Sequence, residues 1–276
     1  MQLIPRSFGK RDVKRNSRYV GGFLSPVRGF VFLSFDGKTR NLFKLFLKER
    51  VAMMERKMYS EELAGIKRLT LEMGQKTVEA VKLAAQALIA NDQEAAARAR
   101  SLEKEVDDIY RQIDDRCIVS IATQQPMAGD LRFLVSTLKI ATEIERIADY
   151  ANNIAKMVQK KFAHEDMSPI ESMKASVDIM AREAVSMLSE ALEAYSKNDS
   201  ELAILVPKRD ALVNRLNKDL FRNILAMATV KQYANELAMD FHTAVRYIER
   251  VADRSGNVAE YVYYAVTGFR FPDNKK

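Results

Sequence analysis

Two short phrases with paired carboxylates are the strongest chemical signal in this chain. Glu145 and Asp149 belong to the phrase ERIAD, and Glu249 and Asp253 belong to ERVAD, which follows 104 residues later. Each phrase lies in a stretch with helical periodicity, where side chains four residues apart share one face at about 5–6 Å between Cβ atoms. A like-charged pair at this spacing slightly destabilises a helix. Two such pairs at matching places of a repeat predict a bound cation.

The other reactive side chains carry weaker signals. Cys117 is the only cysteine, and its neighbours Ile113 and Ile121 indicate a buried, inert thiol. His242 lies seven residues before Glu249, and we expect a structural or solvent-facing imidazole there rather than a ligand. The sequence has no Gly-rich phosphate loop, no Glu-x-x-His motif and no local signature of a nucleophilic triad. We therefore expect no catalytic residues and a protein that is not an enzyme.

Long helices must hold these pairs, and the sequence predicts six. The chain has 10 Gly and 6 Pro in 276 residues, and apolar residues recur at helical spacing. Asn91-Asp92 and Asn198-Asp199 are expected breaks, and Pro207 is expected to kink the fifth helix or delay its start. The helices are expected to begin at an N-cap Ser60, at Gln93, after an N-cap Asp130, at Ser168-Pro169, after Asp199 and near Gln232, with the last ending at Gly268.

These helices predict an all-α protein of two tandem three-helix bundles, at residues 58–165 and 166–276. Residues 1–57 differ in kind, because they hold half of the glycines and lack sustained helical periodicity. They carry 14 Lys/Arg against 4 Asp/Glu, whereas the rest of the chain is mildly acidic despite the overall net charge of +7. We expect an irregular basic N-terminal extension ahead of the bundles.

Three interpretations of the extension remain open. The first is a misassigned start, with true initiation at Met53, Met54 or Met58 and residues 1–52 poorly ordered and dispensable. The second is a disordered tail that touches anionic lipid or a partner. The third, an arm that binds nucleic acid, is the least favoured, and we expect no nucleic-acid partner. No signal-peptide layout is present, and the lone cysteine fits a reducing compartment, so a cytoplasmic location is expected.

Several ordered motifs resemble the PhoU family. Residues 125–132 read QPMAGDLR, close to the QPxAxDLR turn of that family, which also carries an ERIGD phrase in each of two repeats. The family has two acidic residues four apart on the preceding helix, a motif that Glu103 and Asp107 supply here. The ending at residues 261–268 is also similar. The resemblance covers about residues 58–270, nearly everything except the extension.

This chain departs from the family pattern at three places. Ala148 and Ala252 replace the usual Gly of the two phrases, a mild change inside a helix. In the second repeat the acidic pair reads Asp210 and Asn214, so its second member is an amide with a neutral carbonyl oxygen. A second metal site should therefore bind a cation less tightly than the first.

The resemblance implies metal ions on the surface of the bundles. Helices joined by a short loop are antiparallel neighbours, so their i,i+4 pairs converge on one patch, and carboxylates alone favour hard cations over structural Zn. A divalent or trivalent metal is expected, multinuclear iron first and Mn, Mg or Zn as alternatives. A solvated acidic face paired with Arg111, Arg132, Arg146 or Arg250 is the competing interpretation. The candidate ligands are Glu103, Asp107, Glu145, Asp149, Asp210, Glu249 and Asp253.

The resemblance also implies a regulator of phosphate uptake and phosphate-starvation signalling. Its expected partners are a phosphate ABC transporter and a sensor histidine kinase, and a homodimer is expected. Membrane contact is expected only through those partners or through the basic tail. Two other classes stay open from the residues alone: a metal-dependent enzyme acting on phosphate esters or oxygen, and a metal store.

Overall fold

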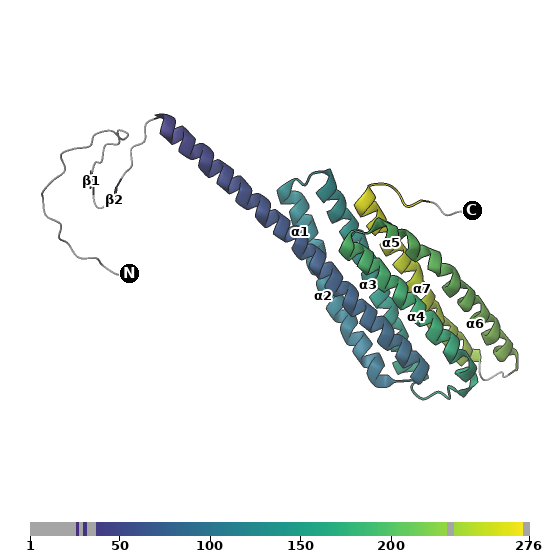
Figure 1. Cartoon of the computed structure of the whole chain (residues 1–276). Coiled ribbons are helices and arrows are strands. Elements are labelled where there is room, and N and C mark those ends of the chain that lie inside the picture. The colour runs from purple at the N-terminus through teal and green to yellow at the C-terminus, as the bar shows by residue number, and fades with distance from the viewer. Residues whose placement is uncertain (1–25, 28–29, 32–36, 231–234, 273–276) are drawn as a thin grey trace. The chain divides into compact units, whose positions relative to one another are not determined.

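Helices make up nearly all of the chain that can be described. The computed structural model describes residues 26–27, 30–31, 37–230 and 235–272 (Figure 1). The elements in chain order are β1 (Pro26–Val27), β2 (Phe30–Val31), α1 (Gly37–Ala90), α2 (Gln93–Gln124), α3 (Ala128–Met157), the π-helical turn η1 (Val158–Phe162), the 3-10 turn η2 (Ser168–Met173), α4 (Lys174–Lys197), α5 (Ser200–Leu205), the 3-10 turn η3 (Val206–Arg209), α6 (Asp210–Val230) and α7 (Asn235–Thr267). The two short strands pair antiparallel, with Pro26 opposite Val31. The all-α class is confirmed.

Two Asn-Asp pairs separate helices as the sequence predicts. Asn91 and Asn198 each adopt the left-handed conformation, with φ of 52°, and so end α1 and α4. The carboxylate of Asp92 accepts hydrogen bonds from the first-turn amides of α2 at 2.9 and 3.0 Å. Asp199 does the same for α5 at 3.0 Å. Each pair therefore closes one helix and caps the next within two residues.

Several expected helix starts are wrong. Helix α1 begins at Gly37, and Ser60 lies inside it, because no Gly or Pro interrupts residues 38–60 and a residue suited to capping does not by itself end a helix. Asp130 lies in the first turn of α3, whose N-cap is Met127. Ser168 opens η2, and α4 starts only at Lys174. The extension is thus helical from Gly37, and the expected start near Gln232 lies outside the described residues.

The chain divides into one unit of residues 1–58 and a second of residues 59–276, with α1 running through the junction. Within the second unit, the part of α1 from residue 59 onward, α2 and α3 form the first bundle, with ion pairs Lys76–Glu105 and Glu62–Arg116 between α1 and α2 (Figure 1). The second bundle consists of α4, the broken helix α5–η3–α6 and α7. The break follows from Pro207, which lacks the backbone N–H that a continuous helix would need. The repeat boundary expected at 165/166 falls in the loop between η1 and η2.

Helices α3 and α7 join the two bundles. Helix α3 packs on both α2 and α7, and α7 also packs on α4 and α6. The apolar members of both phrases are fully buried there, Ile147 and Ala148 on α3 and Val251 and Ala252 on α7. The same core continues across both bundles. In each phrase the two carboxylates flank the buried apolar pair along the helix. Burial of the apolar pair at the α3–α7 contact therefore sets the direction in which the carboxylates point.

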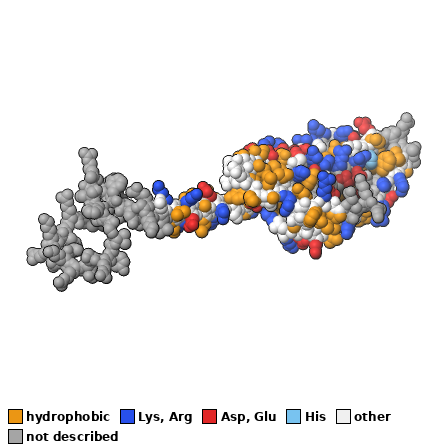
Figure 2. All heavy atoms as spheres, turned by 90° about the horizontal axis from the view of Figure 1, so that it is seen from above, with side chains coloured by type: hydrophobic (Ala, Val, Ile, Leu, Met, Phe, Trp, Pro, Cys, Tyr) orange, Lys and Arg blue, Asp and Glu red, His pale blue; other side chains and the backbone are white. Residues whose placement is uncertain are grey.

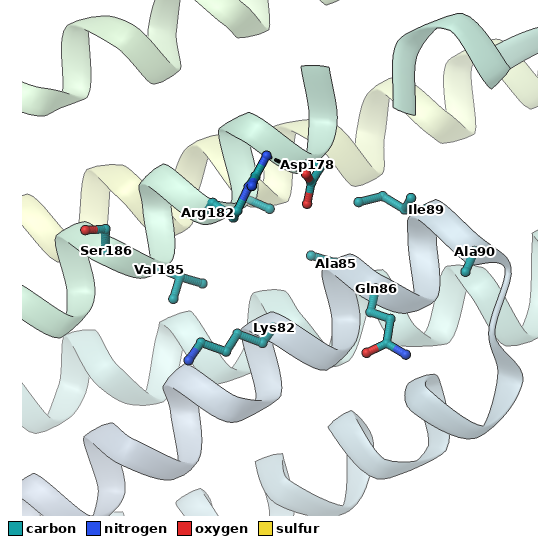
Figure 3. Close-up of a pocket in the computed structure, with 10 residues that line it drawn as sticks. Lys82, Ala85, Gln86, Ile89, Ala90, Asp178, Arg182, Val185 and Ser186 are labelled. Carbon is teal, nitrogen blue, oxygen red and sulfur yellow. Dashed lines mark ion pairs between the residues drawn. The ribbon is translucent and has the colours of Figure 1, made fainter. Parts of the chain in front are cut away.

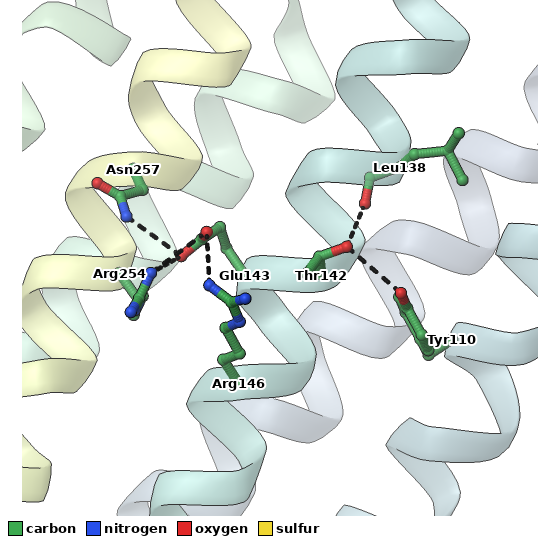
Figure 4. Close-up of polar contacts among 7 residues, drawn as sticks. All are labelled: Tyr110, Leu138, Thr142, Glu143, Arg146, Arg254 and Asn257. Carbon is green, nitrogen blue, oxygen red and sulfur yellow. Dashed lines mark hydrogen bonds and ion pairs between the residues drawn. The ribbon is translucent and has the colours of Figure 1, made fainter.

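A buried carboxylate crosses this contact. Glu143 of α3 is 5% exposed and accepts hydrogen bonds from Arg254 at 3.1 Å and Asn257 at 3.2 Å, both on α7 (Figure 4). Arg146 adds an ion pair at 3.7 Å. Next to Glu143, the hydroxyl of Thr142 meets Tyr110 of α2 at 3.4 Å. A charge buried this deeply is tolerated because it is paired and hydrogen-bonded.

The two repeats meet in an approximately symmetric way, and the Glu143 contact has a counterpart. Residues 104 apart correspond, so Glu143 corresponds to Tyr247 and Tyr150 corresponds to Arg254. Tyr150 and Tyr247 stack with ring centroids 5.8 Å apart. Exchanging the repeats therefore turns the ion pair into the tyrosine pair. One half of the α3–α7 contact is held by charge and the other by aromatic packing.

We predict that Glu143→Ala destabilises the fold by about 2 kcal/mol, because it leaves the Arg254 guanidinium and the Asn257 amide at the interface without their acceptor. The double variant Glu143→Tyr/Arg254→Tyr, which copies the tyrosine pair, should recover at least half of that loss. Urea unfolding followed by circular dichroism measures both.

The matched control is Glu79→Ala, which removes a pair between α1 and α2 whose side chains are 53% and 61% exposed. It should change stability by less than about 0.5 kcal/mol. An equal loss for Glu79→Ala and Glu143→Ala would show that Glu143 holds no special place in the contact.

Candidate functional site

The four acidic residues expected in the first repeat come together. Glu103 and Asp107 lie on α2, and Glu145 and Asp149 lie on α3, two neighbouring helices joined by three residues. Their charges act on one another: Glu145 is influenced by Asp149, Asp107 and Glu103 in that order. We call this set, with Asn152, the first patch.

Proximity and burial disfavour the ionisation of three carboxylates of the first patch, Glu103, Asp107 and Glu145. Burial raises the pKa of Glu145, and the charges of Asp149 and Asp107 add to it. Burial and then Asp149 raise the pKa of Asp107, and burial and then Asp107 raise the pKa of Glu103. In each case the ionised form is disfavoured in the folded protein. A nearby cation would favour the ionised form and so lower these pKa values.

Asn152 belongs to the first patch and escaped the sequence analysis. Its side chain is 4% exposed, and its amide nitrogen donates a hydrogen bond of 2.6 Å to Glu103. Its amide oxygen is buried without a hydrogen-bond partner. The available signal was its position three residues after Asp149, which places both on one helix face. A buried acceptor of this kind costs free energy until a donor or a cation meets it.

The second patch brings together Asp210 and Asn214 of α6 with Glu249 and Asp253 of α7. Asn214 donates a short hydrogen bond to one oxygen of Asp210, and the other oxygen of Asp210 is buried without a partner. Burial raises the pKa of Asp210, and Glu249 adds to it. Asp253 reaches the solvent, but partial burial of its carboxylate and then Asp210 and Glu249 raise its pKa to about 6.

The interruption of the helix at Pro207 positions the second patch. Asp210 is the first residue of α6, directly after the turn η3 that Pro207 introduces. Gly256 of α7 faces that proline, where an added Cβ would stand 3.9 Å from the Pro207 Cβ. Gly256 corresponds to Asn152 of the first repeat, 104 residues earlier. The second patch therefore lacks the buried amide of the first, and its own amide, Asn214, stands where the first patch has Asp107.

Both patches have the chemistry of a hard-cation site but not a closed geometry. Their donors are carboxylate and amide oxygens, which suit Fe, Mn, Mg or Ca better than structural Zn. Each patch also contains a buried oxygen without a partner. Within the described residues, no three acidic, His or Cys side chains stand close enough to hold one metal ion together. The residues fit a cation only if side chains rotate toward it.

The four arginines of the solvated-face interpretation each make a contact outside the patches, although Arg111, Arg146 and Arg250 also act electrostatically on Asp107, Glu145 and Asp253. Arg146 pairs with Glu143, and Arg250 lies over the rings of Tyr150 and Tyr247 at 5.8 and 5.9 Å. Arg111 pairs with Asp108 at 2.5 Å, and Arg132 donates to the carbonyl oxygen of Ala265 at 3.2 Å. The arginine of each phrase thus supports the α3–α7 contact, a role that its sequence position alone does not reveal.

The remaining candidate side chains are structural. Cys117 is fully buried, and burial raises the pKa of its thiol to about 12, as expected for an inert thiol. His242 lies against the ring of Phe221 with centroids 4.6 Å apart, and burial lowers its pKa. His164 is exposed in the loop after η1.

An open groove of about 460 Å³ runs between α1 and α4 (Figure 3). Ile89 and Val185 give it apolar walls, and Lys82 and the Arg182–Asp178 pair, at 2.7 Å, lie along its sides. Neither helix carries a carboxylate of the two patches, so the groove is separate from the candidate metal residues.

Fold and site together define a helical protein of two repeats, each with a carboxylate patch at the same place. The chain belongs to the PhoU domain family, whose model matches residues 70–158 and 177–262. It is similar to the PhoU homologs of Clostridium acetobutylicum (31% identity, covering 78% of this chain and 97% of the relative) and Zymomonas mobilis (30%, 80% and 91%), each called a phosphate-specific transport system accessory protein. The crystal structure of PhoU from Pseudomonas aeruginosa superposes with a TM-score of 0.71 at 29% identity, covering 76% of this chain and all of that one.

The raised pKa of Asp253 predicts a pH dependence of stability. Because its folded-state pKa of about 6 exceeds the usual 3.8, the folded protein holds this proton more tightly than the unfolded chain. Ionising Asp253 therefore costs stability as the pH rises from about 4 to about 6, and the full cost remains above that range.

Metal-free Asp253→Asn should be more stable than wild type by about 1 kcal/mol near pH 7.5, a figure reduced for solvent screening, and the difference should vanish near pH 4. Urea unfolding across this range, with a chelator present, measures it. Asp115→Asn, an exposed acid on α2, is the control. Parallel stability curves for wild type and Asp253→Asn would contradict the prediction.

Proposed function

We propose that this chain is a regulatory accessory protein of phosphate transport. Its membership of the PhoU family supports this, and so does the extent of the similarity, since the alignment spans 97% and 91% of the two relatives named above. The structural observation that carries the proposal is the pair of carboxylate patches at matching places on one scaffold of two repeats. Such a surface suits a regulatory protein that acts by binding other molecules.

The finer proposal is that each patch binds a divalent or trivalent metal, iron first, with Mn, Mg or Zn as alternatives. Glu103, Asp107, Glu145 and Asp149 would hold it in the first repeat, with the free amide oxygen of Asn152 as a further donor. Asp210, Glu249 and Asp253 would hold it in the second. A bound cation would offset the burial and mutual repulsion that raise the pKa values of Glu103, Asp107, Glu145, Asp210 and Asp253, and it would link two helices of a bundle.

Cation binding would change the charge of a surface that a partner protein contacts. We propose that the chain is an adaptor for a phosphate ABC transporter and a sensor histidine kinase, and that it restrains the starvation response when phosphate is plentiful. Each patch spans two helices on one side of the α3–α7 contact. A cation could therefore alter partner binding without refolding the chain.

Deletion of the gene tests the coarse proposal. In phosphate-rich medium the deletion should raise expression of phosphate-starvation genes and alter phosphate uptake, and the wild-type gene should reverse both. Complementation with Glu145→Ala/Asp149→Ala should fail, whereas Glu79→Ala should succeed. Unchanged uptake and unchanged starvation-gene expression in the deletion would overturn the proposal.

Affinity capture tests the partners. The tagged chain, incubated with detergent-solubilised membranes from phosphate-replete cells, should retain subunits of a phosphate transporter and a histidine kinase. Retention should fall for Glu145→Ala/Asp149→Ala and persist for Glu79→Ala. Capture of neither protein by the wild-type chain would reject the adaptor role while leaving the cation sites to be judged by metal content.

We predict that the two patches differ in metal affinity. Glu145→Ala/Asp149→Ala should lose more bound metal than Glu249→Ala/Asp253→Ala, because the amide of Asn214 offers less charge than a carboxylate. Asn214→Asp should increase metal binding by the second patch. Elemental analysis after loading with Fe, Mn or Mg and removing excess metal measures all three variants.

Thermal melts give an independent readout. Metal at a hundredfold excess over its dissociation constant should stabilise the wild type by about 2.7 kcal/mol, because it binds only the folded state. The metal-free Glu145→Ala/Asp149→Ala variant should match or exceed metal-free wild type, since the like-charge repulsion is gone. Equal metal content in wild type and all variants would leave the patches as a solvated acidic surface.

A further inference from the structure

The N-terminal part of α1 exposes an unusual number of large apolar side chains. Residues 44–58 are helical and exposed throughout. Within these 15 residues the exposed fractions run from 46% to 73% for Leu45, Phe46, Leu47, Val51, Met53, Met54 and Met58. Single exposed apolar residues are normal on a protein surface, but seven large ones within 15 residues mark a candidate binding surface. We call residues 44–58 the basic helix.

Basic side chains outnumber acidic ones in the basic helix. The segment holds five Lys or Arg residues, at positions 44, 48, 50, 56 and 57, against Glu49 and Glu55. The preceding residues are also basic, so residues 1–57 together carry 14 Lys/Arg and 4 Asp/Glu. The partner that covers this helix must therefore accept apolar side chains and supply negative charge.

Most of the apolar side chains lie on one side of the helix, whereas basic side chains lie on both sides. At 100° per residue, Phe46 and Met53 share one row, and Leu47, Met54 and Met58 lie on the row beside it. Lys44, Lys48 and Glu55 lie on the opposite side. Figure 2 shows hydrophobic and basic side chains next to each other along this part of α1. The helix is therefore partly amphipathic: Lys44, Lys48 and Arg56 lie away from the apolar rows, Arg50 and Lys57 lie among them, and Leu45 lies outside them.

Arg50 and Lys57 fall among the apolar rows, and long basic side chains in such positions are compatible with an interface. Arg50 lies over the ring of Phe46, with the guanidinium carbon 5.7 Å from the ring centre. Its aliphatic stem thus covers apolar surface while its charge can reach toward headgroups. The helix is not a membrane span, because no helix in the described part of the chain is long and apolar enough to cross a bilayer.

We propose that the basic helix lies in the headgroup region of an anionic lipid bilayer and holds this protein at the membrane surface. A second copy is the less suitable occupant, since it would bring two strongly basic extensions together. Nucleic acid would match the charge but leaves Phe46, Met53 and Met54 without apolar contacts. A lipid surface satisfies both requirements through one face of the helix.

A tryptophan reporter tests the contact directly, because the chain contains no Trp. The full-length Phe46→Trp protein should show blue-shifted emission with phosphatidylcholine vesicles that contain about one third phosphatidylglycerol. It should show little shift with pure phosphatidylcholine, and about 1 M salt should weaken the effect. The control is Ile118→Trp on α2, where the native side chain is 52% exposed, and its emission should not change.

Vesicle co-sedimentation of matched variants separates apolar from electrostatic contributions. Phe46→Gln/Met53→Gln/Met54→Gln keeps the charge and should lower the partition coefficient about tenfold, and Lys44→Gln/Lys48→Gln/Arg50→Gln should lower it similarly. The control replaces exposed apolar residues elsewhere, Ile118→Gln/Met127→Gln/Met239→Gln, and should partition as wild type. Unchanged melting temperatures show that each variant keeps its fold.

Three outcomes would overturn the proposal. Equal partition of the wild type and the Phe46/Met53/Met54 variant would assign any binding to the basic charge alone. Equal binding to anionic and neutral vesicles would remove the role of the lipid charge. A blue shift of Phe46→Trp without lipid, together with a doubled mass in light scattering that the Gln variant lacks, would show that a second copy covers the helix.

Discussion

The contact between α3 and α7 is the constraint on which the rest of the structure depends. Each helix belongs to one repeat, and each carries one of the two acidic phrases. Ile147 and Val251 bury themselves at this contact, and the carboxylates spaced around them must then point toward α2 or α6. A change in the crossing of α3 and α7 would therefore reorient both patches together. The geometry of the candidate site follows from the core beneath it.

The approximate symmetry of that contact is broken by individual side chains. The ion pair of Glu143 with Arg254 and the stack of Tyr150 on Tyr247 occupy corresponding positions, yet one is charged and the other aromatic. The patches differ as well, with the buried amide of Asn152 on one side and Asn214 on the other. Duplication thus supplies one architecture, while single substitutions give each half its own electrostatics.

Much of the fold follows from local sequence rules, and the failures have identifiable causes. The Asn-Asp breaks and the interruption at Pro207 act within a few residues, so they were predictable. The start of α1 was not, because Ser60 resembles a cap but nothing before it stops the helix. The carboxylates were found because i,i+4 spacing is readable from sequence. Asn152 and the roles of Arg146 and Arg250 depend on contacts between helices, which one sequence does not display.

The two patches lower the stability of the metal-free fold. They lie on the same helices whose buried faces stabilise it. Carboxylates with raised pKa values cost free energy when ionised, so the metal-free protein carries a local penalty on α2–α3 and again on α6–α7. The buried α3–α7 contact can absorb that penalty because it does not depend on the patches for its own packing. A cation bound at either patch would remove this penalty on a scaffold that is already folded, so its binding energy would not be consumed in folding the chain.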